Sequence, residues 1–124
     1  MQHPIVEPGT VRVDARGTFI EALNGGHWES LICGSMKAEA VMGDHFHRQT
    51  VVFFFLTAGA AQIDTVDVAS GERDRVRLDA NQGLLLRTGE SHAIRFLQDS
   101  QFVMLKSRRY DAADPDTFAF PVTT

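Results

Sequence analysis

The chain has 124 residues, which is the usual size of one domain and too short for two full cores. Hydrophobic residues make up 44% and charged residues 23%, an ordinary globular composition that argues against intrinsic disorder. The net charge of −4 argues against a nucleic-acid partner or an anionic membrane surface.

Short apolar stretches follow one another along the chain and are separated by Gly, Asp, Asn and Ser, which is typical of an all-β sandwich or barrel. The candidate strands are 10–13, 18–23, 29–36, 39–42, 51–57, 60–68, 74–78, 83–87, 93–96 and 101–107. No window of a dozen residues has helical periodicity, although residues 111–114 before Pro115 are compatible with one short helix or turn. The sequence therefore predicts a single all-β domain.

Alternation within these strands predicts which side chains face the core. In 76–78 the even-numbered residues face the core, and in the last strand Phe102 and Met104 face opposite to Val103 and Leu105. The stretch 51–57 is apolar on both faces, so we expect a second sheet or a partner subunit to cover it. Its three consecutive phenylalanines, 53–55, favour a homodimer.

The compartment is predicted from cysteine content and from the absence of targeting signals. Cys33 is the only cysteine, so no internal disulfide can form, as is usual in a reducing compartment. The longest apolar run, 51–56, is far too short to cross a membrane, and the first residues lack the pattern of a signal peptide. We expect a cytoplasmic protein that binds no membrane.

Three histidines form the candidate site. His45 and His47 are separated by one residue, so in a strand they point to the same face. His92 follows a tight turn about 45 residues later. Imidazole is the commonest metal ligand in proteins and titrates near neutrality, so the three residues are candidates for a divalent-metal site or an acid/base site.

The segments around these histidines resemble the two motifs of the cupin superfamily. The first motif appears as Gly43-Asp44-His45-Phe46-His47 and runs on to Gly59, and the second appears as 83–92, with Thr88 in place of the usual proline. The resemblance implies a cupin domain, a double-stranded β-helix or jelly-roll barrel spanning 1–124. Its core would be 28–107, with N-terminal strands in 10–23 and a tail in 108–124.

This sequence departs from the cupin motif at one position, where Val51 aligns with the glutamate that usually supplies the fourth metal ligand. Counting by twos from His47 places four residues on the same inward face, namely Gln49, Val51, Phe53 and Phe55. Three possibilities remain open. Three histidines can hold Zn, Fe, Ni or Mn with positions left for substrate or dioxygen; a metal-free site can use one histidine as general base; or the site only binds a small molecule.

Two further segments resemble the sugar-nucleotide cupins, which include 3,5-epimerases and 3,4-ketoisomerases of dTDP-keto-sugars and the cupin domain of capsular sugar reductases. These are Asp14-Ala15-Arg16-Gly17 near the start and the segment 109–118 near the end. The likeness implies isomerisation or epimerisation beside a ketone, with His47 as base and His45 as its partner.

Four polar residues near the motifs are candidates to bind the substrate. Arg48 and Arg87 can reach a diphosphate at the barrel mouth, although a solvated rim explains them equally well. Gln49 is a candidate to orient the substrate, and Tyr110 to act as an acid or to stack on a base. The competing functions are an isomerase or epimerase, a three-histidine metal cupin with dioxygenase, lyase or hydrolase chemistry, and a non-catalytic ligand-binding cupin.

Overall fold

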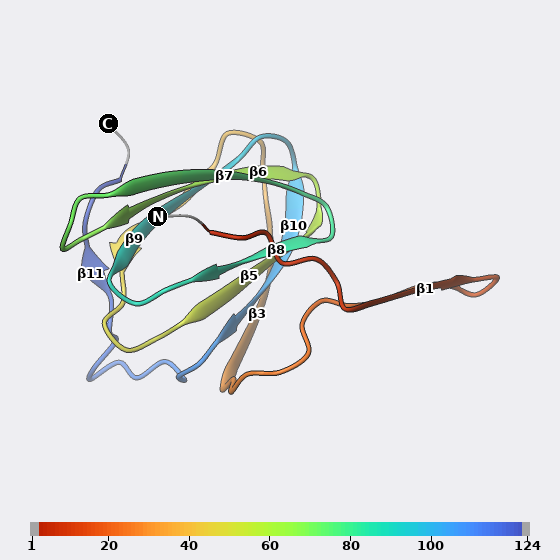
Figure 1. Ribbon diagram of the computed structural model, residues 1–124, viewed down its shortest axis with the longest axis horizontal. Helices are drawn as coiled ribbons and strands as arrows, with labels where there is room; N and C mark the ends of the chain where they lie inside the picture. The colour runs from red at the N-terminus through yellow and green to blue at the C-terminus, as the bar shows by residue number, and fades with distance from the viewer. Residues whose placement is uncertain (1–2, 123–124) are drawn as a thin grey trace.

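The computed structural model describes residues 3–122 and consists of antiparallel strands joined by short turns (Figure 1). The strands are β1 (Thr10–Asp14), β2 (Gly17–Glu21), β3 (Ser30–Met36), β4 (Val41–Phe46), β5 (Val52–Ala58), β6 (Ala60–Asp67), β7 (Arg73–Asp79), β8 (Gln82–Leu86), β9 (Glu90–Phe96), β10 (Ser100–Lys106) and β11 (Phe118–Ala119). The expectation of a single all-β domain is confirmed.

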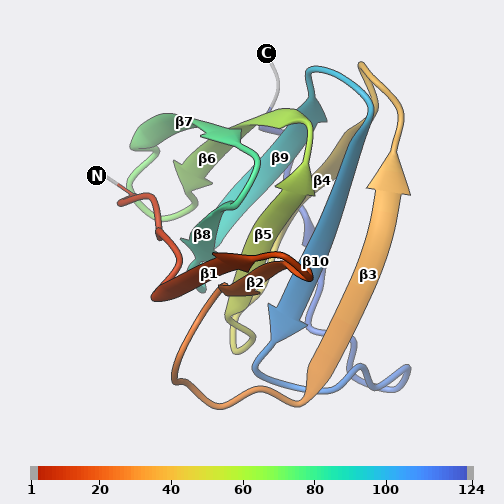
Figure 2. The ribbon, with the colours of Figure 1, turned by 90° about the vertical axis from the view of Figure 1, so that its right-hand side faces the viewer.

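Two sheets face each other and enclose the core (Figure 2). One sheet has the order β3-β10-β5-β8 and the other the order β11-β4-β9-β6-β7. Stacked aromatic rings fill the space between them, with the centroids of Phe54 and Phe102 5.4 Å apart and those of Phe96 and Phe102 5.8 Å apart. Each of these phenylalanines is at most 4% exposed, so they supply much of the apolar surface that holds the sheets together.

All ten predicted strands are present, and the deviations are local. The strand expected at 39–42 lies at Val41–Phe46 instead, so it extends to within one residue of His47. The short strand β11 was not predicted, because its two residues have no periodicity of their own and are ordered only by pairing with β4. Residues 112–114 form a turn, not a helix.

The prediction that Gln49, Val51, Phe53 and Phe55 face the site is wrong. Residues 47–51 form a loop with bends, so strand alternation does not continue from His47 into β5. Val52 pairs with Leu86 and Lys106 on the inner face, which places Phe53 and its neighbour Phe55 on the outer face. Both phenylalanines are nevertheless at most 3% exposed within one chain. Their burial therefore does not require a partner subunit.

The hairpin formed by β1 and β2 projects away from the two sheets (Figure 1). All five residues of β1 are exposed, including Val11 at 56% and Val13 at 72%, and Phe19 on β2 is 58% exposed. Among residues 3–122, no helix has the length and apolar character needed to cross a membrane.

Candidate functional site

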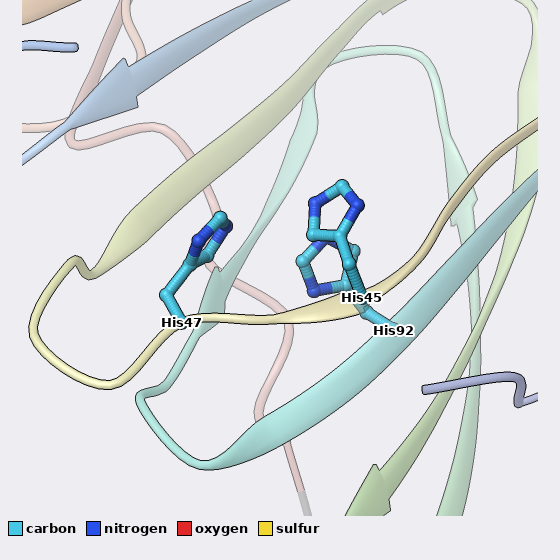
Figure 3. A group of neighbouring side chains, drawn as sticks. All are labelled: His45, His47 and His92. Carbon is cyan, nitrogen blue, oxygen red and sulfur yellow. The ribbon is translucent and has the colours of Figure 1, made fainter. Parts of the chain in front are cut away.

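The three predicted histidines converge on the inner face of the five-stranded sheet (Figure 3). His45 on β4 is the register partner of His92 on β9, and their ring centroids are 4.8 Å apart. The ring of His47 lies 5.1 Å from that of His45 and 5.9 Å from that of His92. One nitrogen from each ring can be chosen so that all three lie within 4.8 Å of one another. The structure thus brings together residues that are up to 47 positions apart.

A bulge in β4 aims the first two histidines into the barrel. The β4–β9 register shifts between Gly43 and His45, with Asp44 as the extra residue, and both Gly43 and Asp44 have positive φ (108° and 60°). A side chain at Gly43 would collide with the main-chain carbonyl of His92, so the close approach of β4 to β9 requires glycine there. Asp44 is fixed in turn by the main-chain N–H of Val122, which donates to its Oδ1 at 2.9 Å.

The C-terminal tail fixes the ring of His47. Nδ1 of His47 lies 2.7 Å from the main-chain oxygen of Asp116. A carbonyl oxygen can only accept, so Nδ1 carries the proton, and in the neutral ring the lone pair is on Nε2. His47 is 5% exposed, so this hydrogen bond is shielded from water.

The carboxylate of Asp116 holds the loop that follows His47. It accepts hydrogen bonds from the main-chain N–H groups of Arg48 and Gln49, both at 2.9 Å, and from the N–H and hydroxyl of Thr50, both at 2.8 Å. Burial raises the pKa of Asp116, but these hydrogen bonds to the ionised form outweigh it and lower the pKa from 3.8 to about 2. Through its carbonyl and its carboxylate, one tail residue fixes both His47 and the adjoining loop.

The histidines line a small cavity of about 80 Å³, and the side chain of Lys106 also lines it. Its other lining residues are Met42, Gly43, Val52, Ile94 and Met104. Val52, and not Val51, is the β5 residue that reaches the cavity, and no carboxylate lines it among the described residues. A larger open hollow, of about 710 Å³, lies on the outer face of β6 and β7, where Arg75 is already paired with Asp64 at 2.7 Å.

Two of the imidazoles are held in their neutral form. Burial, together with the neighbouring histidines, lowers the pKa of His92 from 6.5 to about 3. Burial also lowers the pKa of His45, with additional effects from His47 and from the charge of Lys106. Both rings are therefore uncharged at neutral pH and can accept or donate hydrogen bonds or bind a cation through a lone pair.

The four predicted substrate-binding residues lie outside this cavity. Within the described chain, Gln49, Arg48, Arg87 and Tyr110 are all exposed and none of them lines the cavity. The guanidinium of Arg48 lies 4.1 Å from the centre of the Phe118 ring, and Tyr110 is 69% exposed. Arg48 and Gln49 contribute main-chain N–H groups to Asp116. Their role in binding substrate stays a prediction.

Two residues of the site were not predicted from the sequence. Lys106 was placed only at the end of a strand, although its alternation with Met104 and Phe102 marks it as facing inward. Asp116 lies in the tail segment 109–118 and was given no role in the site, because its contacts with His47 and Thr50 join residues 69 and 66 positions apart.

Comparisons with known proteins agree with this architecture. The dTDP-4-dehydrorhamnose 3,5-epimerase from Sulfolobus tokodaii has a TM-score of 0.79 at 20% identity, covering 93% of this chain and 74% of that one. The rmlC epimerase of Mycobacterium tuberculosis has a TM-score of 0.75 at 24% identity, with coverages of 91% and 70%.

The capsular polysaccharide assembling protein CapF from Staphylococcus aureus has a TM-score of 0.73 at 22% identity over 96% of this chain. The chain spans about a third (35%) of the length of that protein. No functionally curated protein matches the sequence. Residues 12–118 match the family described as the polysaccharide biosynthesis C-terminal domain. The fold is therefore of the cupin type seen in the dTDP-sugar epimerases, and the chain belongs to the polysaccharide biosynthesis C-terminal domain family.

Proposed function

We propose that this domain isomerises or epimerises a keto-sugar nucleotide, or a related keto compound, by acid/base chemistry in the three-histidine cavity. The observation that carries the proposal is the hydrogen bond from Nδ1 of His47 to the carbonyl of Asp116. It leaves Nε2 as the basic nitrogen of a buried, immobilised ring, as a general base requires.

The reaction begins when Nε2 of His47 removes a proton from the carbon beside the ketone. The electron pair moves onto the carbonyl oxygen and forms an enolate. In an epimerisation a proton returns to the same carbon from the opposite face. In an isomerisation a proton is added to the former carbonyl carbon, and the hydroxyl on the neighbouring carbon loses its proton and becomes the new ketone. Lys106 lies in the same cavity and provides a positive charge close to where this negative charge develops. The neutral rings of His45 and His92 supply hydrogen bonds without adding competing charge.

The size of the cavity decides how much of such a substrate can enter. About 80 Å³ is well below the roughly 300–1,000 Å³ of typical ligand pockets, so it accommodates the reacting carbonyl group and not a whole nucleotide. We propose that the remainder of the substrate lies at the exposed rim, where Arg48 and Arg87 can contact a diphosphate.

The test is exchange of solvent deuterium into a dTDP-4-keto-6-deoxyhexose, followed by NMR in metal-free buffer. We expect label at the carbon beside the ketone, and we expect His47→Asn to slow its incorporation by about 10²–10⁴-fold, the usual contribution of a general base. His27→Asn, which changes an exposed histidine outside the cavity, is the matched control. Exchange that is absent in the wild type, or unaffected by His47→Asn, would refute the proposal.

A metal-dependent cupin is the second candidate, favoured by the cluster of three histidine nitrogens. Neutral imidazoles suit Zn, Fe, Ni or Mn, and His45, His47 and His92 would hold such an ion. A bound ion would polarise a substrate carbonyl. The positive charge of Lys106 in the same cavity opposes a second cation, and this favours the acid/base proposal. Less than about a tenth of an equivalent of metal after gentle purification would exclude the second candidate.

We also propose that the protein is a homodimer, joined through the β1–β2 hairpin. One face of the hairpin carries Val11, Val13 and Ile20, and a two-stranded hairpin that packs on nothing is marginally stable in water. A second copy offers an exposed apolar side chain on the outer face of β3, where Leu31 is 63% exposed. Light scattering should give the dimer mass for wild type and for Arg77→Ser, and the monomer mass for Val13→Lys; a monomeric wild type would refute the proposal.

A further inference from the structure

Two buried polar atoms beside the histidine cavity have no hydrogen-bond partner within residues 3–122. They are Nδ1 of His92 and Oγ1 of Thr65. His92 is 5% exposed and Thr65 is 2% exposed, so water does not reach them freely. Buried polar groups are nearly always hydrogen-bonded, and each exception calls for a physical explanation.

The strand register places the side chains of these two residues next to each other. Thr65 on β6 is the direct partner of His92 on β9, and partners on neighbouring strands point to the same face. The Cβ atoms of such a pair are about 4.5–5.5 Å apart. A rotation of the Thr65 side chain, or one water molecule, is enough to connect its hydroxyl to Nδ1.

The same row of side chains continues to a carboxylate. On the other side of Thr65, its register partner is Asp74 on β7. Asp74 is held by His3, whose main-chain N–H donates to Oδ2 at 2.9 Å and whose Nδ1 lies 2.6 Å from the same oxygen. The hydrogen bond to His3 is the main cause that lowers the pKa of Asp74, so the carboxylate is ionised and can only accept hydrogen bonds.

Asp74 and Thr65 are register partners that form no hydrogen bond with each other, but the charge of Asp74 favours one orientation of the Thr65 hydroxyl. A Thr65 hydroxyl whose proton is turned toward the negative carboxylate would have its oxygen lone pairs available to accept from Nδ1–H of His92. A neutral imidazole that donates through Nδ1 has its lone pair on Nε2.

We propose that Thr65 is the positioning residue for His92, accepting its Nδ1–H directly or through one water and thereby directing the Nε2 lone pair into the cavity. Thr65 would then do for His92 what the carbonyl of Asp116 does for His47. Both rings would present the same nitrogen to a substrate or an ion. The assignment concerns the cavity of the proposed function but does not depend on any turnover.

The test is the tautomer of His92 in Thr65→Val and Thr65→Ser, measured by long-range ¹H–¹⁵N NMR at neutral pH. We expect one tautomer, protonated at Nδ1, in wild type and Thr65→Ser. In Thr65→Val, which keeps the shape but removes the acceptor, we expect a mixture or the reversed tautomer. Thr57→Val changes an exposed threonine and should leave the spectrum of His92 unchanged.

Thr65→Val keeps the shape of the side chain and should still fold, with a lowered Tm because the buried Nδ1–H of His92 loses its proposed acceptor. Thr65→Cys, with a weak acceptor in place of the hydroxyl, is a second variant and should give an intermediate ratio of tautomers. If the tautomer of His92 were the same as in wild type in both Thr65→Val and Thr65→Cys, the proposal would be overturned. The main-chain carbonyl of Glu90, which raises the pKa of His92, would then be the group that holds the ring. A changed tautomer in a variant that still exchanges deuterium would support the role of Thr65 and count instead against a need for His92 in the reaction.

Discussion

Replacing the carboxylate of Asp116 tests whether the tail organises the site. Asp116→Asn is the appropriate change, because Asp116 has a positive φ of 52° and asparagine adopts this conformation readily. The variant therefore removes the charge without straining the backbone. The main-chain carbonyl that accepts from His47 stays in place.

The expected cost follows from the four hydrogen bonds to the carboxylate. Oδ2 accepts three of them and Oδ1 accepts the fourth, from Arg48. If the asparagine oxygen takes the place of Oδ2, it keeps three hydrogen bonds, but each is weaker by about 1 kcal/mol because the acceptor is no longer charged. The NH₂ group then faces the N–H of Arg48, which loses its acceptor. The lowering of the Asp116 pKa from 3.8 to about 2 independently corresponds to about 2 kcal/mol. We expect the free energy of unfolding to fall by about 2–4 kcal/mol.

Urea and thermal denaturation at pH 7 measure this change, which corresponds to a decrease in Tm of about 10 °C for a domain of this size. Asp114→Asn, at a neighbouring aspartate whose side chain is 64% exposed, is the matched control and should change stability by less than about 0.5 kcal/mol. Thr50→Val, which removes one of the four hydrogen bonds, should cost about 1 kcal/mol. If Asp116→Asn were as stable as Asp114→Asn, the organising role of the tail would be refuted.

Three further predictions concern charge, pH and backbone geometry. Lys106→Met should raise the pKa of His45, because the ammonium of Lys106 lowers it, and NMR titration measures this change. The same variant should slow deuterium exchange by about 10²-fold, because it removes the positive charge near the developing enolate. Lys37→Met, the control, should change neither. Because folding lowers the pKa of Asp116, the ionised carboxylate should contribute about 2 kcal/mol to the free energy of unfolding above about pH 4, and this contribution should decline toward pH 2. Asp116→Asn should remove this pH dependence from a plot of stability against pH. Gly43→Ala should leave little folded protein by circular dichroism, because its φ of 108° disfavours a side chain and a Cβ atom would collide with the main chain of β9.

Local patterns were sufficient to predict most of the fold. Alternating apolar residues and turn residues marked ten strands, because strand formation depends on short-range side-chain direction and on local turn chemistry. The same rule placed His45 and His47 on one face, and the turn before His92 marked the third residue of the cluster.

Alternation failed where the chain leaves the sheet. It predicted that Val51 faces the site, but the loop 47–51 interrupts the period and Val52 occupies that place. The error did not alter the chemistry, because both positions carry valine and the cavity has no carboxylate among its described lining residues. Which valine faces inward depends on the pairing of β5 with β8 and β10. The sequence of residues 47–51 does not predict that pairing, because the partner strands are far away in the chain.

The sequence by itself determined the all-β class, the strand content and the three histidines, because each depends on residues that are close along the chain. Only the tertiary structure decided what surrounds those histidines. Lys106 enters their cavity from β10, Asp116 reaches His47 across 69 residues, and Thr65 lies opposite His92 on a neighbouring strand. These contacts join segments far apart in the chain, so they exist only once the two sheets have closed around the core.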